Sequence, residues 1–354
     1  MQAFLKGGKI TTEKKPSKSN VEKKTAPTPW VEKYRPKSVD DVVEQGEVIA
    51  VLKKCLSGAD LPNLLLYGPP GTGKTSTILA AARQLFGDIY KDRILELNAS
   101  DERGIHVIRS KVKTFSQLSA SATRPDGKPC PPFKIIILDE ADSMTHAAQS
   151  ALRRTMEKET KTTRFCLICN YVSRIIPPLT SRCTKFRFKP LGEEKVIERL
   201  NFISAEENIT ISEGVLKTLA VTSGGDMRRA ITCLQSCSRL RGKDQEIRES
   251  DMFEVTGLIP DRKIVELLEV CKTSNYSKLE DFVEELNLSG YSIAQFFEQF
   301  NEYLVNTDGL TNKQKAMIGK KLGECCYRLE DGGSESLQMM DLGCHIILSL
   351  IANE

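Results

Sequence analysis

The chain has no long uninterrupted run of apolar residues. Over its 354 residues, no stretch approaches the roughly 20 apolar residues that a membrane span needs. The first residues also lack the apolar core of a secretion signal. We therefore expect a soluble protein with neither a membrane anchor nor a secretory leader.

Paired cysteines of the kind that bind zinc are missing as well. Cys166 and Cys169 have the spacing of half a zinc site, but no second Cys pair or His pair follows them, so we expect no metal there. The 11 cysteines are scattered at positions typical of buried side chains, such as Cys166, Cys233 and Cys344. This pattern favours free thiols in a reducing compartment over a disulfide framework.

Net charge is small outside the N-terminal segment. Residues 1–29 contain seven Lys and two Glu, a balance of +5, whereas the whole chain totals +4, so residues 30–354 sum to −1. Any nucleic-acid surface on the folded part must therefore be a local patch. The segment itself has few apolar residues and is predicted to be a disordered basic tail, which aids nuclear import, binds polyanions or only solubilises the chain.

One glycine-rich segment indicates a phosphate-binding loop. It lies between a predicted strand at residues 64–67 and a predicted helix that includes residues 78–82. In this context the glycines let successive backbone N–H groups face an anion at the positive end of the helix, which argues against a plain surface turn. We predict that Lys74 contacts the β- and γ-phosphates and that Thr75 holds Mg²⁺. The nucleotide-binding residues predicted here are Gly68, Pro69, Pro70, Gly71, Thr72, Gly73, Lys74, Thr75 and Ser76.

A second apolar run ends in two carboxylates. Residues 135–138 are typical of a strand buried on both faces, and Asp139 and Glu140 follow. We predict that Asp139 binds Mg²⁺ directly or through water and that Glu140 orients and polarises the attacking water. The alternative is that the pair only caps the next helix. Together with the loop, the pair predicts a Mg²⁺-dependent nucleoside triphosphatase.

The remaining pattern divides the chain into regions. Strands at residues 64–67, 94–97, 134–138 and 165–170, with helical stretches between them, indicate a parallel sheet covered by helices. Amphipathic helices at 193–207, 212–222 and 226–240 predict a small lid. A last helical block has no catalytic signature, and we favour an assembly surface over plain core. Helix-starting capping boxes are predicted there at Ser292 with Gln295 and at Thr311 with Gln314. The predicted boundaries are a tail at 1–29, an ATPase domain at 30–190, a lid at 191–257 and a helical domain at 258–354.

Several longer strings carry a family resemblance. They occupy residues 30–36, 97–104, 138–142, 181–183 and 225–228. Together with the phosphate loop, they resemble the AAA+ ATPases and, more narrowly, the small subunits of eukaryotic replication factor C, the sliding-clamp loader. Residues 129–133 and 167–174 are most similar to one paralogous group of these subunits. The resemblance covers nearly the whole folded chain and implies an α/β fold: an AAA+ P-loop NTPase parallel sheet, a helical lid and an all-α C-terminal collar.

The resemblance also implies roles for single residues of the site. Val31, Arg35 and Val43 would border the adenine, whose flat π-face suits apolar and cationic neighbours. Asn170 would act as a first sensor, an amide that hydrogen-bonds the γ-phosphate or the lytic water. Arg228 would act as a second sensor that ties the lid to the nucleotide state. Taken alone, either residue would more often be structural.

Three arginines are implied to act on partners. Arg182 would be an arginine finger for ATP bound by the neighbouring subunit, the alternative being a surface Arg paired with a carboxylate. Arg103 and Arg109 would face primer–template DNA, the alternative being a solvated helix face. Residues 115–118 are a further candidate for contact with the clamp.

The function implied is that of an ATP-driven motor subunit. With ATP and Mg²⁺, and with sibling subunits in a nuclear hetero-pentamer, it would open the ring-shaped sliding clamp (proliferating cell nuclear antigen) and load it onto primed DNA in replication and repair. One alternative is a non-hydrolysing scaffold of a checkpoint or repair loader, against which the presence of Lys74, Glu140, Asn170 and Arg228 argues. Another is a homohexameric AAA+ branch-migration helicase.

Overall fold

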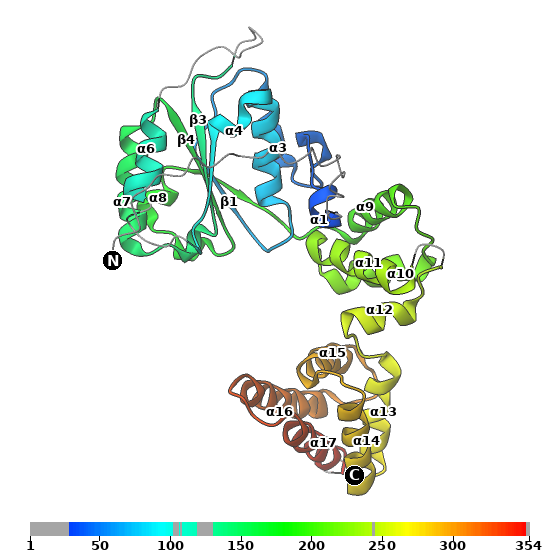
Figure 1. Ribbon diagram of the computed structural model, residues 1–354. Helices are drawn as coiled ribbons and strands as arrows, with labels where there is room; N and C mark the ends of the chain where they lie inside the picture. Colours follow the sequence, from blue (N-terminus) through cyan, green and yellow to red (C-terminus); the bar gives the residue numbers. More distant parts are fainter. Residues whose placement is uncertain (1–27, 102–105, 107, 119–129, 243–244, 352–354) are drawn as a thin grey trace, which may run out of the picture.

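The computed structural model describes residues 28–101, 106, 108–118, 130–242 and 245–351. These residues form a sheet domain, a helical lid beside it and a separate C-terminal helical bundle (Figure 1). No helix of the described part is long and apolar enough to cross a membrane. The predicted basic tail lies outside the described residues except for its last two positions, and Arg103 lies outside them as well.

A parallel sheet forms the centre of the first domain, as predicted, and it has five strands where the sequence predicts four. The strand order is β2-β3-β4-β1-β5. The edge strand β5 has no counterpart in the sequence prediction, because only Phe186 of its four residues is buried and it therefore lacks an apolar run. The strands are β1 (Leu64–Tyr67), β2 (Ile94–Asn98), β3 (Lys134–Asp139), β4 (Thr163–Cys169) and β5 (Thr184–Arg187).

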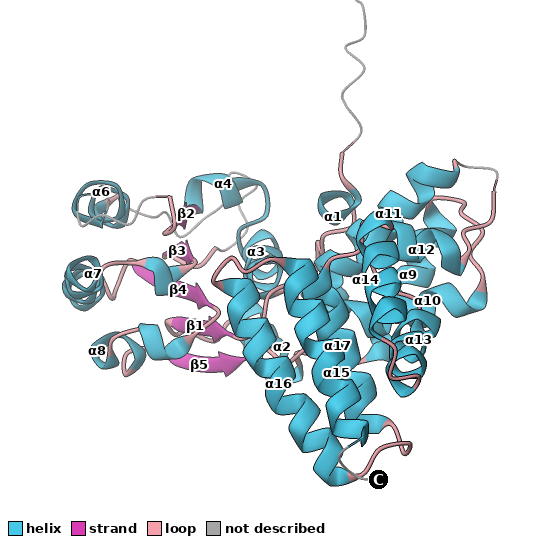
Figure 2. Ribbon diagram, turned by 90° about the horizontal axis from the view of Figure 1, so that it is seen from below, coloured by secondary structure: helices cyan, strands magenta, loops and turns pink. Residues whose placement is uncertain are grey.

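Helices cover both faces of this sheet (Figure 2). Alternate residues of β3 enter the two cores: Ile135 and Ile137 pack with one set of helices, and Ile136 and Leu138 with the other. Because both faces are buried, the central strands β1, β3 and β4 are largely apolar runs. One face carries α2 (Gly46–Leu56), α3 (Lys74–Phe86) and α4 (Tyr90–Arg93), and the other α6 (Lys113–Gln117), α7 (His146–Lys158) and α8 (Pro177–Thr180).

The lid encloses an apolar cluster of its own. The short helix α1 (Trp30–Lys33) packs on this cluster, although the sequence assigns it to the ATPase domain. The backbone N–H of Trp30 donates to Gln235 (3.2 Å), and the Tyr34 hydroxyl donates to Glu207 (2.7 Å). The N-terminal segment is thus attached to the lid. The lid helices are α9 (Glu193–Glu206), α10 (Glu213–Ser223), α11 (Met227–Arg241) and α12 (Glu249–Thr256).

The C-terminal bundle confirms the predicted all-α region. The capping box of Thr311 and Gln314 is complete, because each side chain accepts a hydrogen bond from the other residue's backbone N–H. At Ser292 the structure gives only half of the box: its hydroxyl accepts from the N–H of Gln295 (3.5 Å). The bundle consists of α13 (Asp261–Lys272), α14 (Tyr276–Leu288), α15 (Ile293–Asn306), α16 (Asn312–Glu330) and α17 (Glu335–Ile351).

The cysteines are free thiols, as predicted, and all 11 lie in the described residues. Cys166 is buried in the sheet, where burial raises the pKa of its thiol. Cys233 and Cys344 are only partly buried, so the expectation of buried side chains is wrong for these two. Burial also raises the pKa of the Cys233 thiol, so neither Cys166 nor Cys233 is an easily ionised nucleophile.

Candidate nucleotide-binding site

The loop between β1 and α3 has the backbone that an anion site requires. Gly71 and Gly73 have φ angles of 67° and 92°, a region that side chains disfavour. Gly73 directly precedes Lys74, the first residue of the 13-residue helix α3. The loop therefore ends at the positive end of a helix dipole, where phosphate oxygens bind favourably.

Lys74 lies at the centre of this loop and is only 8% exposed. Its Nζ donates to the carbonyls of Gly68 and Pro69 (2.8 Å each) and to Oδ1 of Asn170 (3.0 Å). Burial lowers the pKa of this ammonium group, although Asp139 acts in the opposite direction. The predicted phosphate-binding cation and the predicted first sensor are thus in direct contact, even though 96 positions separate them in the sequence.

Two hard oxygen donors lie beside the loop. The Thr75 hydroxyl donates to Oδ2 of Asp139 at 2.7 Å, so the predicted Mg²⁺ ligands are neighbours. No group of three or more His, Cys, Asp or Glu side chains within the described ranges could hold a metal by itself. A hydroxyl with one carboxylate nevertheless fits Mg²⁺, which usually takes one or two carboxylates and completes its shell with water and substrate phosphates.

Glu140 follows Asp139 in an unusual backbone conformation. Its φ is 51°, a left-handed value that is uncommon outside glycine. Its N–H donates to Oδ1 of Asp139 (2.9 Å), which helps to fix this turn. The exposed carboxylate lines the same pocket as Lys74. Strain of this kind is often concentrated at functional positions.

Asp142 is a positioning residue that sequence reasoning missed. Its Oδ2 accepts hydrogen bonds from the backbone N–H groups of Asn170 and Tyr171, both at 3.2 Å. It thereby ties the carboxyl end of β4 to the segment after β3. The signal was available, because Asp142 is one of three acidic residues that follow the apolar run of β3, and the ends of parallel neighbours lie together.

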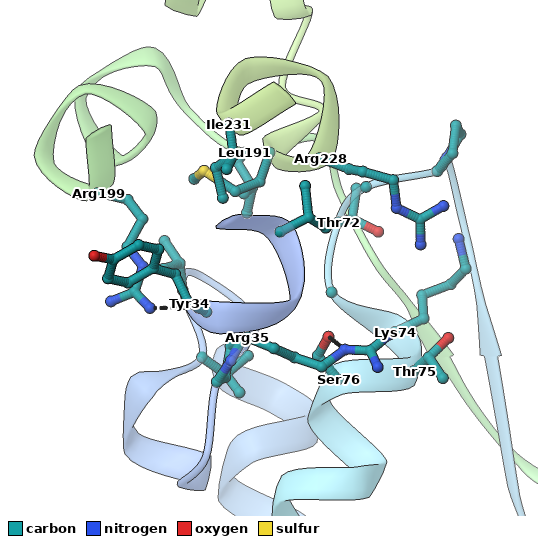
Figure 3. Close-up of a pocket in the computed structure, with 18 of the residues that line it drawn as sticks. Tyr34, Arg35, Thr72, Lys74, Thr75, Ser76, Leu191, Arg199, Arg228 and Ile231 are labelled. Atoms are coloured by element: carbon teal, nitrogen blue, oxygen red, sulfur yellow. Dashed lines mark hydrogen bonds between the residues drawn. The ribbon is translucent and has the colours of Figure 1, made fainter. Parts of the chain in front are cut away.

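The lid closes the pocket from the other side. The N–H of Met227 donates to the carbonyl of Gly71 (3.2 Å), and Asp226 caps α11 by accepting from the N–H groups of Arg228 (2.8 Å) and Arg229 (3.1 Å). Figure 3 shows the side chains of Arg228 and Lys74 reaching toward each other. Within the described chain, the Arg228 guanidinium makes no hydrogen bond or ion pair, so it is available for an anion.

The opposite end of the pocket is more apolar. Val31, Arg35 and Val43 line it, and Nε of Arg35 donates to the Ser76 hydroxyl at 3.2 Å. Arg199 also lies here, and its guanidinium donates to the backbone carbonyl of Tyr34 at 2.8 Å (Figure 3). Sequence reasoning missed Arg199 and the other lid residues that line the pocket, because nothing in an amphipathic helix marks the residue that faces a ligand. The lining residues it missed are Tyr34, Pro36, Asp41, Val42, Leu191, Arg199, Met227 and Ile231.

Most of the predicted site residues share this one pocket. Gly68 and Pro69 do not line it but lie just behind, where their carbonyls hold Lys74. The predicted residues that line it are Val31, Arg35, Val43, Pro70, Gly71, Thr72, Gly73, Lys74, Thr75, Ser76, Asp139, Glu140, Asn170 and Arg228.

Arg182 and Arg109 lie elsewhere. Nη2 of Arg182 is 2.5 Å from Oε1 of Glu157, and Nη1 donates to the Pro178 carbonyl (2.7 Å). Arg182 thus forms the carboxylate pair that the alternative prediction, a surface arginine, describes. Arg182 is still 38% exposed and does not line the pocket of its own chain. Arg109 belongs to a short π-helix, Ile108–Val112, and its side chain lies outside the described residues.

Three family models match successive parts of the chain. The ATPase family associated with various cellular activities (AAA) matches residues 64–191. The RCF1/5-like AAA+ ATPase lid domain matches residues 198–239. The Replication factor C C-terminal domain matches residues 259–345.

Curated relatives match nearly the full chain. Replication factor C subunit 4 of Homo sapiens is 55% identical over 100% of both chains. Replication factor C subunit 2 of Saccharomyces cerevisiae is 48% identical, covering 93% of this chain and 95% of the relative. The replication factor C small subunit of Staphylothermus marinus is 43% identical, covering 88% and 92%.

A solved structure of the Thermotoga maritima RuvB Holliday junction branch migration motor has a similar fold. Its TM-score is 0.52, with 67% of this chain and 78% of that chain covered. The sequences are 17% identical, so the likeness concerns the fold alone.

Proposed function

The chain belongs to the replication factor C subunits, a family of AAA ATPases, and we propose that it is the ATP-hydrolysing small subunit of a hetero-pentameric sliding-clamp loader. In this proposal it acts in the nucleus, with sibling subunits, the ring-shaped clamp and primer–template DNA as partners, during replication and repair. The observation that carries the proposal is the pocket in which Lys74, Glu140, Asn170 and Arg228 meet, from four separate segments.

The phosphate end of the pocket supplies the charge that ATP needs. The backbone N–H groups of the loop and the Lys74 ammonium would bind the β- and γ-phosphates. Thr75 and Asp139 would hold Mg²⁺, which neutralises charge on the phosphate oxygens. Arg228 would contact the γ-phosphate from the lid, and Val31, Arg35 and Val43 would border the adenine.

Glu140 and Asn170 would prepare the attacking water. Glu140 is exposed within the pocket, so its carboxylate can accept a hydrogen bond from a water molecule and orient it toward the γ-phosphate. The Asn170 amide oxygen faces Lys74, and its backbone is fixed by Asp142. The amide can therefore report the presence of the γ-phosphate at a constant position. These contacts support a hydrolysing subunit over the scaffold alternative.

Arg182 would complete a neighbour's site. It does not line the pocket of its own chain and is partly exposed, and both observations support a role in trans. The Glu157 pair holds the side chain near the surface until assembly offers a phosphate as a competing partner. A trans arginine makes hydrolysis conditional on assembly, because it stabilises charge that develops in the transition state.

The DNA assignment rests on the sequence. We propose that Arg103 and Arg109 contact the DNA backbone, so that binding weakens steeply with salt and shows little sequence preference. The likeness to the branch-migration motor does not extend to this assignment or to activity, so a helicase function is not proposed.

The test is the ATPase rate of the reconstituted complex, with and without clamp and primed DNA. Sibling sites are inactivated so that only the site completed by Arg182 hydrolyses ATP. We expect strong stimulation by clamp plus DNA and a loss of about 10³-fold in Arg182→Ala. The exposed Arg239→Ala is the matched control.

Glu140→Gln is tested in a second complex in which only this chain's own site is active. It should bind ATP normally but hydrolyse it far more slowly. A rate that ignores clamp and DNA and is unchanged by Arg182→Ala would contradict the loader mechanism. A stable homohexamer in native mass measurements would contradict it as well.

A further inference from the structure

Glu44 has a strained backbone next to the apolar end of the pocket. Its φ is 63°, one of four left-handed values among the non-glycine residues that the structure describes. The two preceding residues, Val42 and Val43, line the nucleotide pocket. A residue remains in this conformation only where its surroundings hold it, and such residues are concentrated at clamps and switches.

The Glu44 carboxylate contacts residues 189–192, the segment that joins β5 to the lid and is called the hinge here. Its Oε2 accepts the backbone N–H of Gly192 at 2.7 Å. Gly192 is the N-cap of the 14-residue helix α9 and has no side chain to cap it. A Cβ atom on Gly192 would lie 2.9 Å from Oε1 of Glu44, so the carboxylate approaches as closely as glycine allows. Glu44 therefore supplies from a distant segment the negative group that favours a helix start.

Gln45 holds the other end of the same hinge. Its Nε2 donates to the Lys189 carbonyl at 3.2 Å, and the side chain is 7% exposed. Two consecutive residues thus grip residues 189–192, which join β5 to the lid. The same segment is bonded to the turn before α11, because the N–H of Leu191 donates to the carbonyl of Gly225 (3.3 Å). Gly225 lies three positions before Arg228.

These contacts form a short path across the pocket. One end is Val43, which touches both the pocket and the apolar cluster of the lid. The other end is Arg228, whose guanidinium depends on the lid for its position. We propose that Glu44 is a positioning residue that couples the adenine end of the pocket to the lid and thereby aims Arg228 at the γ-phosphate. This inference rests on the proposed nucleotide site.

A double-mutant cycle tests the coupling. The full-length chain with Mg²⁺ is titrated with ATP and with ADP, and the ratio of the two affinities is measured for wild type, Glu44→Ala, Arg228→Ala and the double variant. We expect Glu44→Ala to reduce the preference for ATP about tenfold. Arg228→Ala should abolish the preference, and the double variant should match Arg228→Ala alone, because Glu44 acts through that arginine. If Glu44 only stabilised the fold, Glu44→Ala would lower the affinities for ATP and ADP together and leave their ratio unchanged. In the double variant, its loss of affinity would then add to that caused by Arg228→Ala.

Two further variants separate the carboxylate from the backbone strain. Glu44→Gln keeps an acceptor oxygen for the Gly192 N–H and should retain most of the preference for ATP. Glu44→Gly relieves the left-handed strain but removes the acceptor, so it should behave like Glu44→Ala. Glu194 is an exposed carboxylate that lines the same surface cavity as Glu44 and Gly192, so Glu194→Ala is the matched control and should behave like wild type.

The outcomes distinguish the two proposals. A wild-type chain that binds neither nucleotide would contradict the proposed nucleotide site. A wild type that prefers ATP, together with a Glu44→Ala variant that matches Glu194→Ala or adds to Arg228→Ala, would overturn the role of Glu44 alone. Thermal melting of each variant identifies one that fails to fold, and Glu44→Gly then decides the case, because it carries no backbone strain.

Discussion

The two walls of the nucleotide pocket are held in place by different kinds of interaction. The sheet wall is built around one buried cation: Lys74 is surrounded by two carbonyls and the Asn170 amide, and Thr75 bonds Asp139 beside it. The lid wall depends on a few contacts near solvent, such as Met227 with the Gly71 carbonyl and Arg199 with the Tyr34 carbonyl. The lid wall can therefore be displaced at lower cost than the sheet wall.

This difference matches what each wall has to do. The sheet wall binds the phosphates and must keep its donors fixed, because preorganised groups stabilise developing charge best. The lid wall carries Arg228, which is useful as a sensor only if its position responds to the nucleotide. A pocket with one firm and one adjustable wall converts the loss of the γ-phosphate into a movement of the lid.

The largest effect should come from breaking the sheet wall at Lys74. Lys74→Ala removes the only side-chain cation that the phosphate loop contributes, and we expect ATP hydrolysis in the assembled complex to fall about 10²–10³-fold. The exposed Lys91→Ala, on the neighbouring helix α4, is the control and should leave the rate unchanged. A loss of less than tenfold in Lys74→Ala would show that the backbone of the loop binds the phosphates without the ammonium group.

The next largest effect should arise where the walls meet. A Cβ atom at Gly71 would lie 1.7 Å from Oδ1 of Asp226, so Gly71→Ala must displace the start of α11. Left-handed strain and overpacking together should lower the free energy of unfolding by about 3 kcal/mol. Gly257 has a similar φ of 68° with nothing within 4 Å, so Gly257→Ala isolates the strain and should cost about 1–2 kcal/mol. Chemical denaturation measures both, and equal losses would mean that the lid yields without cost.

Most of the sheet wall could be predicted from the sequence because its residues belong to short local patterns at the ends of strands. The phosphate loop joins a strand to a helix, and Asp139 and Glu140 follow an apolar run, so strand ends in a parallel sheet bring them together without further information. The strand β5 could not be predicted in the same way. It is an edge strand with one buried residue, and its pairing with β1 decides its conformation.

Periodicity predicted the lid helices, but the role of Arg228 in the lid wall was predicted only through family resemblance. Arg228 lies in an amphipathic helix, and Arg199 in another, and periodicity alone indicates which face is buried but not which residue meets a ligand. The packing of α1 on the lid depends on Gln235 and Glu207, which are 205 and 173 positions away from their partners in the sequence. Contacts of this range are set by tertiary packing and leave no local pattern.

The smallest effect should come from loosening the lid wall at one hydrogen bond. Tyr34 lines the pocket, and its hydroxyl donates to Glu207 at 2.7 Å, so Tyr34→Phe removes that bond and keeps the ring. We expect the free energy of unfolding to fall by about 1 kcal/mol. The KM for ATP should rise two- to threefold at an unchanged kcat, because a contact on the base side acts equally on ground and transition states. Tyr276→Phe, an exposed tyrosine of the bundle, is the control. A change in kcat would mean that α1 positions reacting groups, and the division into a firm and an adjustable wall would then have to be abandoned.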